Sequence, residues 1–239
     1  VQGATVYAAN TDALHLSVTK ADDKILIGKE LTRGLGCGGL PQRGREAAKE
    51  ALVDIKKAVA NSDMVFVVTG LGGGTGTGAA PVVAQIAKES GAVVIGVVTM
   101  PFESEKARLD KAEFGLQGLR EVTDTCIVLD NNRLVDIAGQ LPIEQAFAVA
   151  NELVSTMIKG IVETITLPSL INLDYADVST IMKGGGVAVI GIGEDDSSER
   201  VNQAVKQALT HPLLDVDYKG ATGALIHVTC GPDLKLEEF

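Results

Sequence analysis

The chain has 239 residues and a formal net charge of −10, with 46% hydrophobic and 22% charged residues, which is an ordinary composition for a soluble globular protein. The acidic balance argues against a surface for nucleic acid or anionic membranes, because both need clustered Lys and Arg. No apolar run approaches the roughly 18 residues of a membrane span. The three cysteines are widely spaced without a metal-ligand pattern, which indicates a reducing cytoplasm.

The chain begins almost inside a strand, at VQGATVYAAN, and stops within an amphipathic pattern, at DLKLEEF. We therefore expect a fragment that lacks both ends. Strands are predicted at 4–10, 24–28, 64–70, 92–100 and 125–131, and helices at 44–62, 79–90 and 105–122. Strands rich in Val and Ile on both faces, alternating with helices, indicate a doubly wound α/β domain with a mostly parallel sheet. Such sheets bind ligands at the carboxyl ends of their strands.

A different pattern begins at Ile143, where apolar residues recur at steps of three or four as far as Ile165. This spacing predicts one long central helix, with Pro168 as the breaker. A strand at 186–193, a helix at 197–210 and a strand at 222–230 follow, and they predict a truncated second α/β domain. The expected organisation is a first domain at 1–142, a connecting helix at 143–166 and a partial second domain at 167–239.

The stretch GLGGGTGTGAAP, from Gly70 to Pro81, lies between a predicted strand and a predicted helix. Glycines before a helix leave backbone N–H groups free to converge on an anion, and the helix N-terminus adds a partial positive charge of about half a unit. A phosphate chain is the natural ligand. The alternative without a ligand is a tight, close-packed turn.

Two other phosphate-binding motifs compete for this stretch. The nucleoside-triphosphatase P-loop is excluded, because no Lys follows Gly78. A dinucleotide fingerprint fits formally at 74–79, but its expected carboxylate would be Glu103, which lies late and beyond a proline.

The heptapeptide GGGTGTG at 72–78 resembles the signature loop of the tubulin/FtsZ family, which wraps the phosphates of GTP. Other stretches agree with that family in order and spacing. Its second and third nucleotide loops are resembled by AANTDALHL (8–16) and RGLGCGGLP (33–41). The family's loop whose Glu and Arg hold the ribose is resembled by VVTMPFESEKAR (97–108), and its synergy loop by NLDYADVSTIM (172–182). The resemblance spans nearly the whole chain, and the run at 213–228 is close to archaeal members.

The resemblance implies two sets of site residues. The implied GTP-binding residues are Gly72, Gly73, Gly74, Thr75, Gly76, Thr77, Gly78, Asn10, Asp12, Gly38, Thr99, Glu105, Arg108, Asn131, Phe147 and Asn151. The last three are the residues implied to touch guanine. The implied catalytic residues are Asn172, Asp174 and Asp177. No metal site made of protein ligands is expected, and Mg²⁺ is expected to arrive with the phosphates.

The sequence departs from the family pattern in two places. The family's first glycine loop, on its first strand, would lie upstream of Val1. The Glu–Arg loop is one residue shorter than usual, which leaves open whether Glu103 or Glu105 contacts the ribose.

Residue types alone also allow simpler roles for several of these side chains. Asp177 suits the N-cap of a short helix, and Asn10 and Asp12 suit the cap of the helix after the first strand of the chain. Phe147 suits a core position on the apolar stripe of the long helix, although Asn151 one turn later favours a base contact.

Asp174 and Asp177 follow a helix of about 23 residues, which spans roughly 35 Å. They cannot readily reach their own nucleotide, but they can reach that of a neighbour in an open-ended, head-to-tail chain. The resemblance thus implies a cytoplasmic GTPase at the division site that forms division-ring filaments and hydrolyses GTP between subunits. Its other implied partners are division-site membrane-anchor proteins, with no nucleic acid and no direct membrane insertion.

Two alternatives stay open. One is a nucleotide-binding cytoskeletal or regulatory paralogue with little hydrolysis. The other is a nicotinamide-dependent oxidoreductase, for which the sequence offers no proton donor at a recognisable spacing.

Overall fold

The computed structural model describes residues 3–167, 173–183, 186–197, 199–210, 220–231, 233–235 and 238. The chain divides into two compact units, one made of Val1–Asn132 and Met182–Ala188, the other of Arg133–Ile181 and Val189–Phe239. No helix in these described ranges is both long enough and apolar enough to cross a bilayer.

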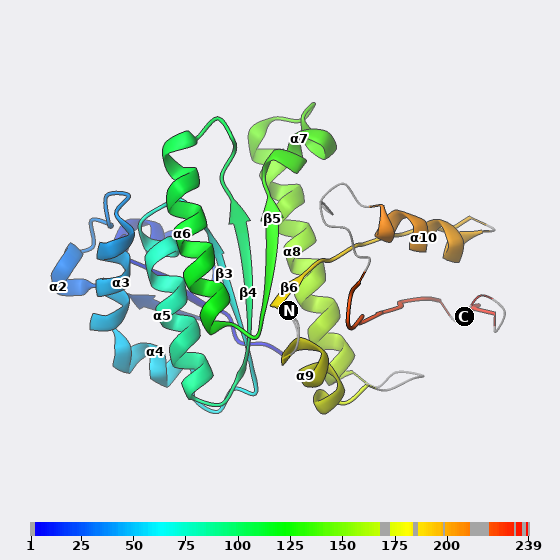
Figure 1. Ribbon diagram of the computed structural model, residues 1–239, viewed down its shortest axis with the longest axis horizontal. Coiled ribbons are helices and arrows are strands. Elements are labelled where there is room, and N and C mark those ends of the chain that lie inside the picture. Colours follow the sequence, from blue (N-terminus) through cyan, green and yellow to red (C-terminus); the bar gives the residue numbers. More distant parts are fainter. Residues whose placement is uncertain are drawn as a thin grey trace. The chain divides into compact units, whose positions relative to one another are not determined.

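The strands of the first unit form two parallel sheets (Figure 1). In the smaller sheet β1 (Tyr7–Asn10) pairs with β2 (Asp23–Leu26). The larger sheet contains, in order, β3 (Met64–Gly70), β4 (Val93–Met100), β5 (Thr125–Asp130) and β6 (Gly186–Ala188). The first six residues of β4 are buried, as expected for a strand covered on both faces.

The helices of the first unit connect these strands. They are α1 (Ala13–Val18), α2 (Lys29–Thr32), α3 (Pro41–Glu50), α4 (Leu52–Val59), α5 (Thr75–Glu89) and α6 (Lys106–Val122). Helix α5 packs between α3 and α6, and α5 and α6 lie side by side over the larger sheet (Figure 1). The core around α5 is made mainly of small side chains, including Ala79, Ala80, Ala84 and Ala87.

Glycines let the backbones of α3, α5 and α6 approach closely. A Cβ atom at Gly78 of α5 would overlap the carbonyl oxygen of Pro41 and lie 2.7 Å from the amide nitrogen of Arg45, both on α3. A Cβ atom at Gly115 of α6 would lie 3.2 Å from the carbonyl oxygen of Thr77. Because these contacts involve backbone atoms, side-chain rearrangement cannot relieve them.

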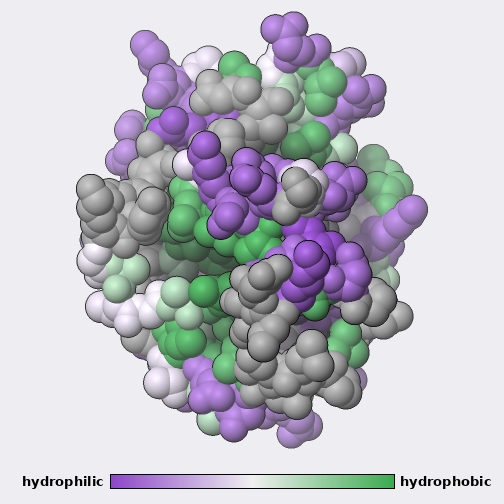
Figure 2. All heavy atoms as spheres, turned by 90° about the vertical axis from the view of Figure 1, so that its right-hand side faces the viewer, coloured by the Kyte–Doolittle hydropathy of each residue, from purple (hydrophilic) through white to green (hydrophobic). Residues whose placement is uncertain are grey.

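The second unit is built on α8 (Ile143–Thr166), which buries Ala150, Met157, Ile161 and Val162. The remaining helices are α7 (Asn132–Ala138), α9 (Tyr175–Lys183) and α10 (Arg200–Leu209). The segment 220–231 contacts α8 through His227, whose Nδ1 lies 2.8 Å from the Thr164 hydroxyl. Apolar side chains of this unit remain exposed, among them Ile226 and Val205. One face of the whole molecule, drawn in Figure 2, shows hydrophobic residues among hydrophilic ones.

Several predicted elements need correction. The prediction of a strand at 222–230 is wrong, because that stretch has no strand pairing, and the strand at 186–193 ends at Ala188. The single helix predicted at 44–62 is two helices joined at Ala51. The helix predicted from residue 79 begins at Thr75, and α7 was not predicted.

Candidate functional site

The candidate site lies where loops that follow β1, β3 and β4 meet in the first unit. The Thr11 hydroxyl, after β1, lies 2.7 Å from the Thr75 hydroxyl, after β3. A Cβ atom at Gly74 would lie 2.7 Å from the Cβ of Cys37. One at Gly72 would lie 3.0 Å from the carbonyl oxygen of Arg108. The predicted second and third loops and the Glu–Arg loop therefore each contact the glycine-rich loop.

Packing explains glycine at most positions of the glycine-rich loop. Gly72 has φ +96°, and its missing side chain leaves room for Arg108. A Cβ atom at Gly74 would crowd Leu40 as well as Cys37, and one at Gly76 would crowd the Thr69 hydroxyl and the Gly70 carbonyl. These glycines are required by the protein itself, whatever the loop binds.

Gly73 is different. A Cβ atom there would have no neighbour within 4 Å, and its φ is not positive. Gly38, on the third loop, also faces open space, although its φ of +60° by itself favours glycine. Neither crowding nor backbone conformation accounts for glycine at position 73, and the open space beside it leaves the backbone accessible to a ligand.

The start of α5 favours an anion in that space. No side chain caps this 15-residue helix, and its first turn carries no acidic residue. Its N-terminal amides and helix dipole therefore attract negative charge. The half-buried Thr75 hydroxyl bonds to Thr11, whereas the Thr77 hydroxyl is buried and accepts a hydrogen bond from the Gly72 amide at 2.9 Å. The Thr77 hydroxyl thus stabilises the conformation of the glycine-rich loop through its bond to the Gly72 amide.

The two polar residues after β1 form a local network. The Asn10 Oδ1 atom accepts a hydrogen bond from the Asp12 amide at 3.1 Å, and the Asp12 Oδ1 atom accepts one from the His15 amide at 3.0 Å. Asp12 therefore caps α1, one of the two roles that its residue type allows. Its other carboxylate oxygen lies on the side of the third loop, 4.0 Å from a Cβ position at Gly36.

The Glu–Arg loop begins α6. Glu105 precedes the helix, accepts a hydrogen bond from the Phe102 amide at 3.3 Å, and pairs with the Arg108 guanidinium at 2.9 Å. The Thr99 hydroxyl lies 3.3 Å from a Cβ position at Gly70, next to the glycine-rich loop. Glu103 is exposed, and its amide donates to the Asn132 side chain at 2.9 Å.

Asn131 lies at the end of β5 and is half-buried, with no hydrogen bond from its side chain to any described residue. Phe147 and Asn151 belong to α8 in the second unit. Phe147 is 39% exposed and Asn151 is exposed one turn later, so neither is a buried core residue of that unit. Their predicted contact with guanine stays a prediction.

Asp174 and Asp177 bond to one another at the start of α9. The Asp177 amide donates to Asp174 Oδ1 at 2.9 Å, and the Asp174 amide donates to Asp177 Oδ2 at 3.4 Å. This reciprocal pair is a capping box. The interpretation of Asp177 as the N-cap is corrected, because the helix begins at Tyr175 and Asp174 holds that position. Both side chains are exposed, and Asn172 lies outside the described residues.

The described residues hold no group of three or more His, Cys, Asp or Glu side chains that could bind a metal ion.

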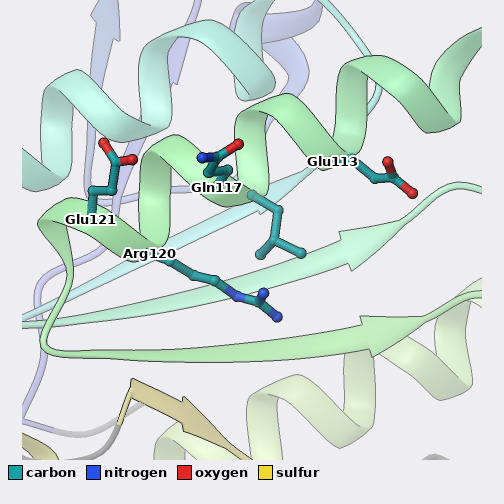
Figure 3. Close-up of a pocket in the computed structure, with 5 residues that line it drawn as sticks. Glu113, Gln117, Arg120 and Glu121 are labelled. Carbon is teal, nitrogen blue, oxygen red and sulfur yellow. The ribbon is translucent and has the colours of Figure 1, made fainter.

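A separate pocket of about 330 Å³ lies along α6, lined by Glu113, Leu116, Gln117, Arg120 and Glu121 (Figure 3). All of its lining residues come from one helix, and none belongs to the glycine-rich or neighbouring loops. Figure 3 shows Arg120 and Glu121 pointing to opposite sides of that helix. Burial raises the pKa of the nearby Cys126 thiol to about 11 despite the Arg120 charge, so this cysteine stays protonated.

Sequence reasoning missed three residues at the loops. Thr11 is fully buried and Cys37 nearly so, and both lie in the hydrogen-bond network of Thr75. The Lys111 ammonium of α6 donates to the Gly39 carbonyl of the third loop at 2.8 Å. Thr11 could have been suspected from its place between Asn10 and Asp12, but only the fold brings Lys111 to the third loop.

Family models match both parts of the chain. Residues 2–139 match the GTPase domain of the tubulin/FtsZ family, and residues 186–239 match the C-terminal domain of the FtsZ family. Cell division protein FtsZ 2 of Methanocaldococcus jannaschii is 57% identical over 241 residues, covering 100% of this chain and 63% of that protein. Cell division protein FtsZ 1 of Archaeoglobus fulgidus is 56% identical over 239 residues, covering 100% of this chain and 65% of that protein.

Solved structures agree with these matches. An empty FtsZ dimer from M. jannaschii has a TM-score of 0.93 and 56% identity, with 99% of this chain and 69% of that chain covered. CetZ from Methanosaeta thermophila has a TM-score of 0.72 and 25% identity, with 85% of this chain and 58% of that chain covered. The fold is thus the predicted α/β fold of these proteins, and the chain belongs to the tubulin/FtsZ family.

Proposed function

We propose that this chain binds GTP at the glycine-rich loop and is part of a GTPase that assembles head to tail into the filament of a division ring. The observation that supports this best is Gly73, which has open space where a side chain would be and lies beside the uncapped start of α5. A phosphate chain lying against the backbone accounts for both features.

The proposed chemistry needs little covalent work from the protein. The α5 amides and the Thr75 hydroxyl hold phosphate oxygens, and Arg108 adds positive charge beside the loop. Mg²⁺ accompanying the phosphates would supply further charge neutralisation. Two carboxylates on the neighbouring loops are engaged, Asp12 in a helix cap and Glu105 in its ion pair with Arg108.

We therefore assign the positioning of the attacking water to Asp174 and Asp177 of a neighbouring subunit. In the chain, the 24-residue α8 separates these carboxylates from the first unit's loops. The FtsZ dimer among the similar structures supports self-association. Relatives that are cell division proteins support a place at the division site in the cytoplasm. Membrane-anchor proteins at that site are part of the proposal as further partners.

A second candidate is a nucleotide-binding filament protein with slow hydrolysis. The capping box favours it, because a structural role at the start of α9 accounts for both carboxylates without catalysis.

One set of variants of the full-length gene product separates these candidates. Asp177→Asn keeps an oxygen that can accept from the Asp174 amide but removes the charge. We expect it to bind GTP and form filaments, while hydrolysis falls about 10²-fold or more, the usual loss for an acid–base group. Asp196→Asn, at another exposed carboxylate of the same unit, serves as the control and should hydrolyse normally.

A mixing experiment then tests for a shared site. Asp177→Asn mixed with Gly73→Val, which should not bind nucleotide, should regain turnover that neither variant shows alone. Normal hydrolysis by Asp177→Asn would limit Asp177 to capping, and negligible hydrolysis by the parent filament would support the second candidate.

A further inference from the structure

Three side chains form a hydrogen-bonded chain that begins in the interior and ends at the glycine-rich loop. The Cys37 thiol donates to Thr11 Oγ1 at 3.4 Å, and Thr11 Oγ1 lies 2.7 Å from Thr75 Oγ1. Thr11 is 0% and Cys37 is 3% exposed, whereas Thr75 is half-buried at the first position of α5. Thr75 is therefore the open end of the chain.

The direction of these hydrogen bonds follows from the chemistry of the groups. A hydroxyl has one proton, and a thiol is a weak donor and an even less suitable acceptor in a buried site. If Cys37 donates to Thr11, the Thr11 proton goes to Thr75, and every buried group is satisfied. The Thr75 proton is then left for a ligand. If Thr75 instead donated to Thr11, the Thr11 oxygen would accept from both neighbours, its own buried proton would lack an acceptor within this chain, and the Thr75 lone pairs would turn toward the anion site.

The positions of Thr11 and Cys37 are themselves firmly held. The Thr11 carbonyl accepts hydrogen bonds from the Thr32 hydroxyl at 3.0 Å and from the Gly36 amide at 3.1 Å. The Cβ of Cys37 lies so close to the Gly74 backbone that a Cβ atom at Gly74 would be only 2.7 Å from it. The hydrogen-bonded chain from Cys37 to Thr75 is therefore in place before a ligand arrives.

We propose that Thr11 and Cys37 are positioning residues that orient the Thr75 hydroxyl as a hydrogen-bond donor to a nucleotide phosphate. Neither residue contacts the nucleotide. This inference rests on the proposed binding of GTP at the same loop. It assigns the two residues a role in anion affinity beyond holding the loops together.

The expected size of the effect follows from the freedom of the hydroxyl. Without Thr11, the Thr75 proton can occupy any of three staggered positions, so Thr11→Val should weaken GTP binding about threefold. Losing the Thr75 donor altogether should cost about tenfold or more, as for a hydrogen bond to a charged group.

The test is a double-mutant cycle in the full-length gene product, with GTP and GDP dissociation constants as the readout. We expect Thr11→Val to weaken binding in the parent but to have no further effect in a Thr75→Val background. Thr11→Ser should restore parental affinity. Thr123→Val is the matched control, because it removes another buried hydroxyl of the first unit, which donates to the Leu119 carbonyl, and its effect should be equal in both backgrounds.

Equal losses from Thr11→Val in the two backgrounds would overturn the proposal and leave Thr11 a purely structural role. If Thr11→Val does not fold, two variants of Cys37 provide the test. Cys37→Ser keeps a donor and should bind GTP more tightly than Cys37→Ala. Equal affinities of these two variants for GTP would refute the proposal. A folded parent that binds neither GTP nor GDP would instead refute the proposed function.

Discussion

Alanine substitutions at Gly73 and Gly78 should have opposite effects, because only one of these glycines is required by packing. At Gly78 the added methyl group would overlap the Pro41 carbonyl, and α3 would have to move away by about 1 Å. Overpacking of this kind costs about 3 kcal/mol at its upper end. Alanine recovers about 1 kcal/mol through its helix propensity. The net loss is about 2 kcal/mol, which lowers the Tm by about 4–8 °C.

At Gly73 the methyl group meets no protein atom. Gly73→Ala should therefore keep the parental Tm or raise it slightly. A less flexible unfolded chain adds up to about 0.4–1 kcal/mol to the free energy of unfolding. The methyl group would occupy the proposed phosphate space. In the parent, GDP at a hundred times its Kd stabilises the fold by about 2.7 kcal/mol, and a hundredfold loss of affinity reduces this to about 0.4 kcal/mol.

Thermal unfolding of both variants of the full-length gene product, with and without GDP and Mg²⁺, measures these effects together. We expect Gly73→Ala to lose the nucleotide-dependent rise in Tm while its own Tm is unchanged. A Gly73→Ala protein that GDP still stabilises by the parental amount would show that the phosphates do not lie at Gly73. A Gly78→Ala protein as stable as the parent would refute the packing argument.

Three further predictions concern ligand class, base choice and pH. GDP with Mg²⁺ should raise the Tm more than NAD does, and a larger rise with NAD would favour a dinucleotide site. Asn151→Leu should weaken GTP binding by about 1–3 kcal/mol and reduce discrimination against ATP in a competition assay, whereas an unchanged preference would leave Phe147 and Asn151 without a base contact. A hydrogen bond from Arg200 lowers the Glu238 pKa from 4.5 to about 2, so the stabilisation from this pair is present above pH 4.5 and is lost as the pH falls toward 2. Arg200→Met should return the pKa of Glu238 toward 4.5 in an NMR titration, and a pKa that stays near 2 would contradict this.

The parts of the fold that could be predicted from the sequence are those with a strong local pattern. The Val- and Ile-rich runs of β3 and β4 and the long stripe of α8 are predicted close to their observed bounds. The start of α5 could not be placed, because glycine disfavours helix. Helical Gly76 is explained by its packing against Thr69 and Gly70, and helical Gly78 by its packing against the distant backbone of α3. The stretch at 222–230 has strand-like residues but no neighbouring strand, and pairing rather than residue type makes a strand.

The candidate site likewise has parts that could be predicted from the sequence and parts that could not. The glycine-rich loop could be found from its composition and flanks, and an anion was the natural ligand for it. The roles within the loop could not be separated, because crowding at Gly74 and open space at Gly73 depend on Cys37 and Leu40, which lie more than thirty positions earlier in the chain. The Cys37–Thr11–Thr75 chain was missed for the same reason.

The glycine contacts between α3 and α5 also limit how this sequence can change over time. At most core positions a larger side chain on one helix can be offset by a smaller one on its neighbour. At Gly78 and Gly44 the opposing atoms are backbone atoms of Pro41 and Gly74, and no substitution makes a backbone smaller. No second mutation at these contacts can compensate for the first. Adaptation of the proposed nucleotide site is therefore expected to proceed through side chains such as Cys37 and Lys111, whose hydrogen bonds at the loops are not part of these backbone contacts.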